Sequence, residues 1–308
     1  MEQINSKQDL INYFEKGCKK ENQLSIGVEH EKFIFDNLTN QRANFEAISK
    51  VFNFLEQFGW KPIKEKDYVI GLSREGQSIT LEPGNQIELS GKKLNSVHFN
   101  CSESYKYLDE LGKACKKLNL KMMSVSFDPF TKLENVPQTP KQRYEIMTKE
   151  MPKDGKLSLH MMYQTCGTQI NLDYISEKDF IKKFKLSSFL VPISTAIFAN
   201  SPIVENSLSG YLSYRSKVWQ NTSRAGLPKI FLEDMDFEKY TDFVINMPLL
   251  FVLKNSKHLN AEGKKFKDFM DGKLSILKNV KPNIVDFKNH LATIFTEVRL
   301  KKYIEIRS

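Results

Sequence analysis

One short segment, Gly27 to Phe35, restricts the possible folds more than any other part of the chain. Its sequence, GVEHEKFIF, predicts an extended strand, in which residues two apart point to the same face. Glu29 and Glu31 are therefore expected side by side, about 6–7 Å apart at the backbone, with Phe33 continuing their face. Two adjacent carboxylates on an otherwise apolar strand repel each other and lose hydration. The segment thus predicts either a cation site on a sheet or a solvated strand edge.

Three further strands carry polar side chains in the same alternating manner. In TLEPGNQIELS (residues 80–90) a Pro-Gly turn can bring Glu82 and Glu88 together, although a polar hairpin without a binding site would show the same sequence pattern. In TCGTQINLD (residues 165–173) the polar face begins at Gln169, and in YIEIR (residues 303–307) Glu305 and Arg307 share one face. Four such strands could form a polar floor for hard, oxygen-preferring cations, and magnesium with ATP fits best.

The remaining pattern predicts an α+β fold with a mostly antiparallel sheet flanked by helices. No internal repeat or low-complexity linker is visible, so residues 1–308 are expected to form a single catalytic domain. Residues 157–174 are predicted mostly as strand, and a helix opening at Ser176 is expected to break near Pro192. Other predicted helices cover 44–58, 102–118, 140–149, 266–274 and 284–295, and other predicted strands cover 26–36, 78–90, 122–127 and 302–307.

Charge and composition narrow the class of ligand. The 46 basic and 37 acidic side chains give a net charge of +9, which suits anionic ligands such as nucleotides or carboxylates. The paired lysines are interpreted as solvated faces, so no nucleic-acid partner is expected. The chain has no leader-like start and no apolar stretch long enough for a bilayer, which predicts a cytoplasmic protein without a membrane partner. Its four cysteines show no metal-binding spacing and are expected to be reduced thiols.

Two arginines stand in unusual surroundings. Arg143 lies in PKQRYEIM and Arg215 in GYLSYRSKVW. A planar guanidinium suits bidentate binding of a carboxylate or phosphate, although each residue could equally form a surface or structural ion pair.

Eight segments in order, from GVEHEKFIF to EVRLKKYIEIRS, resemble glutamate–cysteine ligases of the plant and proteobacterial type. The other six are TLEPGNQIELS, PKQRYEIM, EMPKDG, HMMYQTCGTQINLDYISEKD, FANSPI and GYLSYRSKVW. The resemblance implies a glutamine-synthetase-like catalytic core that holds magnesium ions around the ATP phosphates. By position it implies metal binding by Glu29, Glu31, Glu82, Glu88 and Glu305, cofactor binding by Glu31, Gln169 and Lys141, and binding of glutamate or its phosphorylated intermediate by Arg143, Arg215 and Arg307.

The implied reaction joins the γ-carboxylate of glutamate to the amine of cysteine, the first step of glutathione biosynthesis. A carboxylate is a poor electrophile, so ATP would activate it as γ-glutamyl phosphate before the amine attacks. Magnesium and arginines would stabilise that transfer without a covalent enzyme intermediate.

The resemblance also has departures. Asn85 occupies a turn position where the family pattern has glycine, and the family continues beyond the strand that ends at Arg307. Three explanations are left open: a shortened molecule, a naturally split one, and one completed by a partner or second chain that supplies the C-terminal region. Two alternatives stay open: a non-catalytic nucleotide-binding remnant, and a related ligase that uses another amine.

Overall fold

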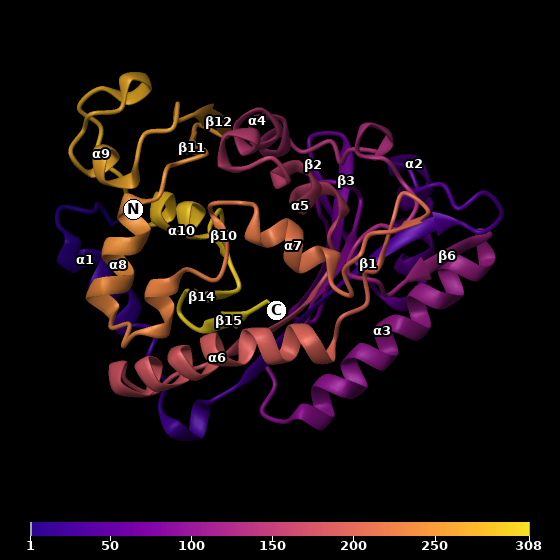
Figure 1. Cartoon of the computed structure of the whole chain (residues 1–308), viewed down its shortest axis with the longest axis horizontal. Coiled ribbons are helices and arrows are strands. Elements are labelled where there is room, and N and C mark those ends of the chain that lie inside the picture. The colour runs from indigo at the N-terminus through magenta and orange to yellow at the C-terminus, as the bar shows by residue number, and fades with distance from the viewer. Residues whose placement is uncertain (1, 308) are drawn as a thin grey trace.

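A nine-stranded antiparallel sheet runs through the part of the chain that the computed structural model describes, residues 2–307 (Figure 1). The strand order is β14-β15-β7-β1-β5-β4-β3-β2, and β6 pairs with the far end of β1. The bounds are β1 (Ile26–Asp36), β2 (Lys61–Glu65), β3 (Tyr68–Arg74), β4 (Gln77–Leu81), β5 (Ile87–Ser90), β6 (Leu120–Met123), β7 (Thr168–Leu172), β14 (Val298–Leu300) and β15 (Ile304–Ile306).

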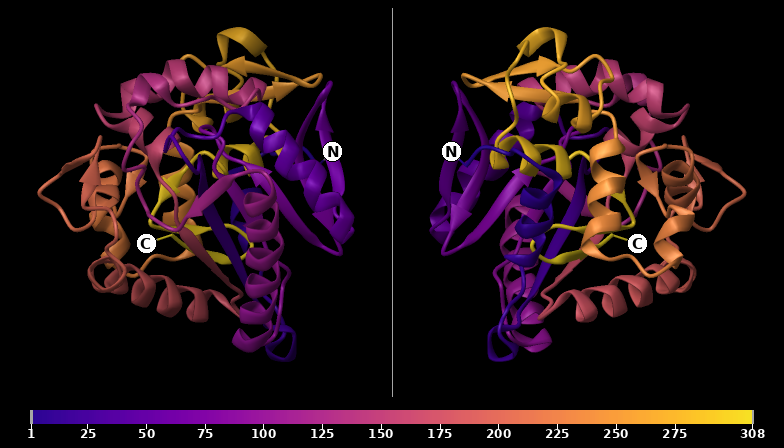
Figure 2. Two further views of the ribbon diagram at one scale, coloured as in Figure 1. Left: turned by 90° about the vertical axis from the view of Figure 1, so that its right-hand side faces the viewer. Right: turned by 90° about the vertical axis from the view of Figure 1, so that its left-hand side faces the viewer.

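Helices cover both sides of this sheet and build a separate lobe beside it (Figures 1 and 2). Short two-stranded ribbons are formed by β8 (Ile203–Val204) with β9 (Ser207–Leu208), β10 (Ala225–Gly226) with β13 (Phe295–Thr296), and β11 (Phe251–Lys254) with β12 (Lys257–Asn260). The α-helices are α1 (Lys7–Glu15), α2 (Phe45–Leu55), α3 (Val97–Lys117), α4 (Gln142–Glu150), α5 (Ser158–Gln164), α6 (Glu177–Ile197), α7 (Tyr214–Gln220), α8 (Phe237–Asn246), α9 (Phe266–Met270) and α10 (Ile284–Leu291).

The alternation along β5 explains why the sheet has one apolar and one polar face. Ile87 and Leu89 are buried in the core that α2 and α3 form on one side of the sheet. Glu88 and Ser90 point to the opposite side, where they line a cavity. A period of two therefore places hydrophobic side chains against the helices and carboxylates against the cavity.

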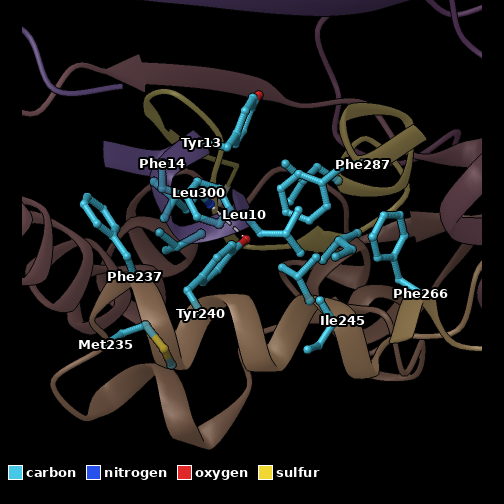
Figure 3. Close-up of a cluster of buried hydrophobic side chains, with 14 of the residues drawn as sticks. Leu10, Tyr13, Phe14, Met235, Phe237, Tyr240, Ile245, Phe266, Phe287 and Leu300 are labelled. Atoms are coloured by element: carbon cyan, nitrogen blue, oxygen red, sulfur yellow. Dashed lines mark hydrogen bonds between the residues drawn. The ribbon is translucent and has the colours of Figure 1, made fainter. Parts of the chain in front are cut away.

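A second core, rich in aromatic side chains, forms the lobe that contains α1, α8, α9 and α10 (Figure 3). Phe14 packs edge-on against Tyr240, with ring centroids 5.7 Å apart, and Phe287 packs against both Tyr13 and Phe266. The Tyr240 hydroxyl accepts a hydrogen bond from the backbone N–H of Leu300. This core therefore anchors the lobe to β14, the strand at the edge of the sheet.

The structure confirms most of the predicted elements. The predicted α+β class, the strand at 26–36, the hairpin at 78–90 and the helix opening at Ser176 are all present. The hydroxyl of Ser176 caps α6 by accepting from the N–H of Asp179. Residues 266–274 and 284–295 are helical over shorter ranges, and β15 occupies the predicted final strand.

Two local predictions were wrong. Residues 158–164 form α5 and not a strand. Consecutive side chains such as Met161, Met162 and Tyr163 are all buried, and a short apolar run of this kind has no periodicity that distinguishes a helix from a strand. Helix α6 continues through Pro192, although an interior proline costs about 3 kcal/mol. Phe180, Phe184 and Val191 are buried in the core along the same helix, and their packing outweighs that local cost.

None of the helices within residues 2–307 has the length and apolar character needed to cross a membrane.

The buried His290 makes a testable contribution to stability. It stacks on Phe266, with ring centroids 5.1 Å apart, and its Nε2 donates to the carbonyl oxygen of Val244. Burial lowers the pKa of His290 to about 4. The unfolded chain binds this proton near pH 6.5, so the native state loses stability as the pH falls from 6.5 to 4.

We expect His290→Gln to reduce that loss by about 2 kcal/mol between pH 6.5 and pH 4, measured by urea unfolding. Glutamine can still donate to Val244 but does not titrate. The exposed His98→Gln serves as the control and should leave the pH profile unchanged. An unaltered slope for His290→Gln would contradict this account.

Candidate functional site

A cavity of about 500 Å³ lies on the polar face of the sheet. Strand β1 supplies Glu29 and Glu31, β5 supplies Glu88, and Glu82 comes from the turn after β4. Strand β7 completes the floor with Gln169, Asn171 and Asp173. The structure thus brings together four of the five glutamates predicted as metal ligands, and the cavity explains the polar alternation of all three strands.

The pairing of the strands fixes the spacing of these side chains. Glu31 lies opposite Glu88 across β1 and β5, and Glu29 lies opposite Gln169 across β1 and β7. Further along β1, Phe33 and Phe35 are fully buried. The predicted alternative of a solvated strand edge is therefore wrong, because the face that carries the carboxylates continues into the core.

The four carboxylates have no cation of their own within the described residues. No ion pair within 4.0 Å involves Glu29, Glu31, Glu82 or Glu88 in residues 2–307. Burial and the neighbouring carboxylates, Glu82 first, raise the pKa of Glu31 to about 7 and that of Glu88 well above its usual range. These two carboxyl groups therefore keep their protons to higher pH, and a bound cation would favour their ionised forms.

Nearby hydrogen bonds hold the carboxylates in place without neutralising them. Asn171 Nδ2 donates to Glu29 at 2.8 Å, and the backbone N–H of Gly167 donates to Glu31 at 2.5 Å. The Oε1 atom of Gln169 is buried and has no hydrogen-bond partner within residues 2–307. An unpaired acceptor beside ionisable carboxylates suits a cation or a ligand proton donor.

Arg143 lines the same cavity as the four carboxylates. Arg143 on α4 stacks on Tyr144, with the guanidinium carbon 4.8 Å from the ring centroid, and donates to its hydroxyl at 2.9 Å. No carboxylate lies within 4.0 Å of Arg143 among residues 2–307. Burial opposes its charge, but Tyr144 and Glu82 raise the pKa of Arg143 above its ordinary value. This guanidinium is charged and available to an anionic ligand.

The other two predicted arginines lie at the boundary with a second cavity of about 350 Å³. Arg307 lines both cavities, whereas Arg215 lines only the second of the two. The Arg215 guanidinium lies 4.2 Å from the Trp219 ring centroid and donates to the carbonyl oxygen of Arg307 at 2.7 Å. Arg215 and Arg307 also line a third, smaller cavity together with Glu31, Glu82 and Gln169, so both arginines lie near the carboxylates of the floor.

Glu305 differs from the other predicted metal ligands. It is fully buried, forms ion pairs with Arg299, Lys301 and Arg307, and does not line the large cavity. Although burial acts in the opposite direction, these three cations hold the pKa of Glu305 well below its usual range. In this structure Glu305 therefore orients cationic side chains, and its contacts give no support to the predicted metal role.

Lys141 lies outside both the large and the second cavity. Its ammonium group is buried, donates to the carbonyl oxygen of Leu81 at 2.6 Å and lines neither cavity. Burial lowers the pKa of Lys141 to about 8. The side chain thus secures the end of β4, and binding of a nucleotide by Lys141 stays a prediction.

Several residues of the site were not predicted from the sequence. Arg299, Lys301 and Tyr303 line the large cavity from β14 and the turn that follows it. They alternate in EVRLKKYIEIRS, so the period of two that revealed the glutamates could have revealed them too. His258 on β12 reaches the cavity from the neighbouring ribbon, and no local sequence signal marked it.

A magnesium ion fits this donor set only with help from a ligand. Within residues 2–307 no three Asp, Glu, His or Cys side chains gather closely enough to hold a metal ion by themselves. Magnesium commonly takes one or two carboxylates and completes its octahedron with water and substrate phosphates. Pairs such as Glu31 with Glu88 suit that arrangement, since both are carboxylates without a cation partner in the described chain.

Comparison with known proteins identifies the family. A family model described as Glutamate-cysteine ligase family 2 (GCS2) matches residues 25–308, and the chain belongs to this family. The chloroplastic glutamate–cysteine ligase of Nicotiana tabacum is 44% identical over 306 residues, which cover 98% of this chain and 59% of the relative. Chloroplastic glutamate–cysteine ligase A of Oryza sativa subsp. japonica is also 44% identical, covering 98% and 62% of the two chains.

Among solved structures, a glutamate–cysteine ligase from Francisella tularensis in complex with AMP aligns with a TM-score of 0.48 and 12% identity. The alignment covers 92% of this chain and 60% of that chain. The chain therefore spans about three fifths of the length of these relatives.

Proposed function

We propose that the chain carries the glutamate-activating site of an ATP-dependent glutamate–cysteine ligase. The observation that supports this most strongly is the cavity lined both by four carboxylates and by Arg143, none of which has an ion-pair partner among residues 2–307. Such a site needs both a metal ion and an anionic substrate to balance its charges. ATP with magnesium and the γ-carboxylate of glutamate supply both.

Magnesium, when bound, would neutralise charge on the ATP phosphates, and the residues placed to hold it are Glu29, Glu31, Glu82 and Glu88. Their side-chain oxygens approach from β1, β5 and the hairpin turn, so phosphates lying over the sheet would meet them from above. Gln169 offers its unpaired Oε1 to the same region.

Arginines that line the same cavity fit the activation of glutamate. A γ-carboxylate oxygen attacks the γ-phosphorus of ATP, ADP leaves, and the product of this step is γ-glutamyl phosphate. Arg143 and Arg307 are placed to hold the carboxylate and the transferred phosphoryl group, because both line the large cavity. The ion pair of Arg307 with Glu305 orients its guanidinium before substrate binds.

The amine then attacks the acyl carbon, and phosphate leaves with the former carboxylate oxygen. Arg215 stands beside Arg307 at the entrance to the second cavity, where it can stabilise the departing phosphate. Cysteine is proposed as the amine because the relatives with 44% identity are named glutamate–cysteine ligases.

The test is incubation of the purified chain with magnesium, ATP, glutamate and cysteine, following ADP and γ-glutamylcysteine together. We expect ADP release that depends on glutamate and is matched by the dipeptide. ADP release that requires an amine other than cysteine would overturn the choice of amine. Binding of magnesium–ATP without any turnover would favour a nucleotide-binding remnant instead.

A further inference from the structure

Glu297 is a buried carboxylate to which the proposed chemistry gives no task. It lies between β13 and β14, is only 3% exposed, and lines neither the large cavity nor the second and third cavities. Its Oε2 atom is buried and accepts no hydrogen bond from residues 2–307. A buried carboxylate is costly unless cations compensate its charge. The surroundings of Glu297 must therefore supply positive charge.

Two arginines supply that charge. Arg215 Nη1 lies 3.9 Å from Glu297 Oε2, and the backbone N–H of Arg307 donates to the carbonyl oxygen of Glu297 at 2.9 Å. Burial raises the pKa of Glu297 above its usual range, and the guanidinium groups of Arg215 and Arg307 oppose that shift. Both guanidinium groups therefore interact with the same carboxylate.

The same two guanidinium groups lie against one aromatic ring. Their carbon atoms are 4.2 Å (Arg215) and 5.3 Å (Arg307) from the ring centroid of Trp219. Two neighbouring cations repel each other, and the negative charge of Glu297 offsets that repulsion. The Nε atoms of Arg215 and Arg307 have no hydrogen-bond partner within residues 2–307, so each guanidinium keeps a donor for a ligand.

We infer that Glu297 is a positioning residue, which holds Arg215 and Arg307 together as a paired site for the phosphoryl group. This role rests on the proposed function, in which Arg307 holds the transferred phosphoryl group and Arg215 the departing phosphate. A phosphoryl group in transfer spreads its charge over three oxygens, and two neighbouring guanidinium groups offer it more donors than one. Because Glu297 lines none of the three cavities, it acts only through the arginines.

The kinetic test compares Glu297→Gln with Glu297→Asp. Glutamine keeps the size of the side chain and removes its charge, so the two arginines lose their shared counter-charge. The paired site is needed only once phosphoryl transfer begins, so kcat should fall about 10–100-fold while the KM for glutamate stays within about threefold. Aspartate keeps the charge, and its kcat should lie between those of the native chain and Glu297→Gln.

Trp219 provides a second measurement that needs no turnover. The only other tryptophan, Trp60, is buried in the core that α2 and α3 form on the far side of the sheet. Fluorescence difference spectra between the native chain and Glu297→Gln therefore report on Trp219. We expect a changed emission spectrum in Glu297→Gln, because the guanidinium groups move relative to the ring, and a smaller change in Glu297→Asp.

Asp286→Asn is the matched control. Asp286 is a buried carboxylate that also lies 3.9 Å from a cation, the ammonium group of Lys254, and it lines none of the three cavities. This variant should change neither kcat nor the emission of Trp219. Urea unfolding establishes that each variant is folded before it is compared.

The outcomes distinguish the positioning role from the ligase activity. A native kcat in Glu297→Gln would overturn the inference, and so would a loss confined to the KM for glutamate or an equal loss of kcat in Glu297→Asp. A native chain without turnover would contradict the proposed function. The spectra then decide the positioning role, and an unchanged Trp219 emission in Glu297→Gln would overturn it.

Discussion

Glu88→Gln is expected to abolish most of the ligase activity while making the ligand-free protein more stable. Glu88 lies opposite Glu31 on the cavity floor, and burial together with Glu82, Glu29 and Glu31 raises its pKa well above the usual range. With magnesium bound, the same carboxylate would balance the charge of the metal. Its removal should lower kcat about 10²–10³-fold, as loss of one electrostatic contact in a preorganised site does.

The stability change has the opposite sign for a clear reason. An acid whose native pKa is raised binds protons more tightly when folded, so its charged form destabilises the protein once the pH exceeds the pKa of the unfolded chain. Neutral glutamine removes that cost, and the unfolding free energy at pH 8 should rise by about 1–3 kcal/mol.

Urea unfolding and initial-rate kinetics on one protein sample measure both effects. Glu46→Gln, an exposed change on α2 beside Lys50, is the matched control and should alter neither activity nor stability appreciably. A Glu88→Gln variant that is less stable than the native chain would contradict the electrostatic account, and one with full activity would contradict the site.

Arg143→Ala should raise the KM for glutamate about 100-fold while leaving the affinity for magnesium–ATP within threefold. Arg143 lines the cavity, has no carboxylate partner within 4.0 Å in residues 2–307, and is charged. Loss of a charge-assisted contact to a buried carboxylate costs about 2–5 kcal/mol. ATP binding depends chiefly on the glutamate floor and should change much less.

Calorimetric titration with magnesium–ATP, together with the KM for glutamate, distinguishes an effect on ATP binding from an effect on glutamate binding. Arg143→Lys is the conservative comparison: it restores the charge but not the planar pair of donors, so its KM should lie between those of Ala and Arg. Equal weakening of glutamate and ATP binding in Arg143→Ala would show that the residue supports the fold instead of one substrate.

The floor of the site could be predicted from the sequence because strands have a period of two. The alternation of polar and apolar residues around Glu29, Glu31 and Gln169 predicts which side chains share a face of the sheet. The hairpin turn then brings Glu82 and Glu88 into the same cavity. The start of α6 at Ser176 could also be predicted from the sequence, because the residues that cap a helix lie within a few positions of one another.

What could not be predicted depends on side-chain contacts made between elements, not within one strand or helix. Glu305 has the same alternation as the other glutamates, yet Arg299 and Lys301 reach it and occupy both of its oxygens. Lys141 resembles a nucleotide ligand in its motif but extends to the Leu81 carbonyl. The periodicity of the sequence predicts neither contact. The contacts of Glu305 depend on how β14 packs in the sheet, and the contact of Lys141 depends on how α4 packs against it.

Activation of the γ-carboxylate of glutamate by ATP is the central step of the proposed function. The measurement is turnover with glutamate labelled by ¹⁸O in the γ-carboxylate, followed by mass spectrometry of the phosphate released with ADP. Attack by the carboxylate predicts one ¹⁸O atom in each phosphate. Phosphate that is released together with ADP but carries no ¹⁸O would show that water attacks ATP, and would contradict the proposed function of this site.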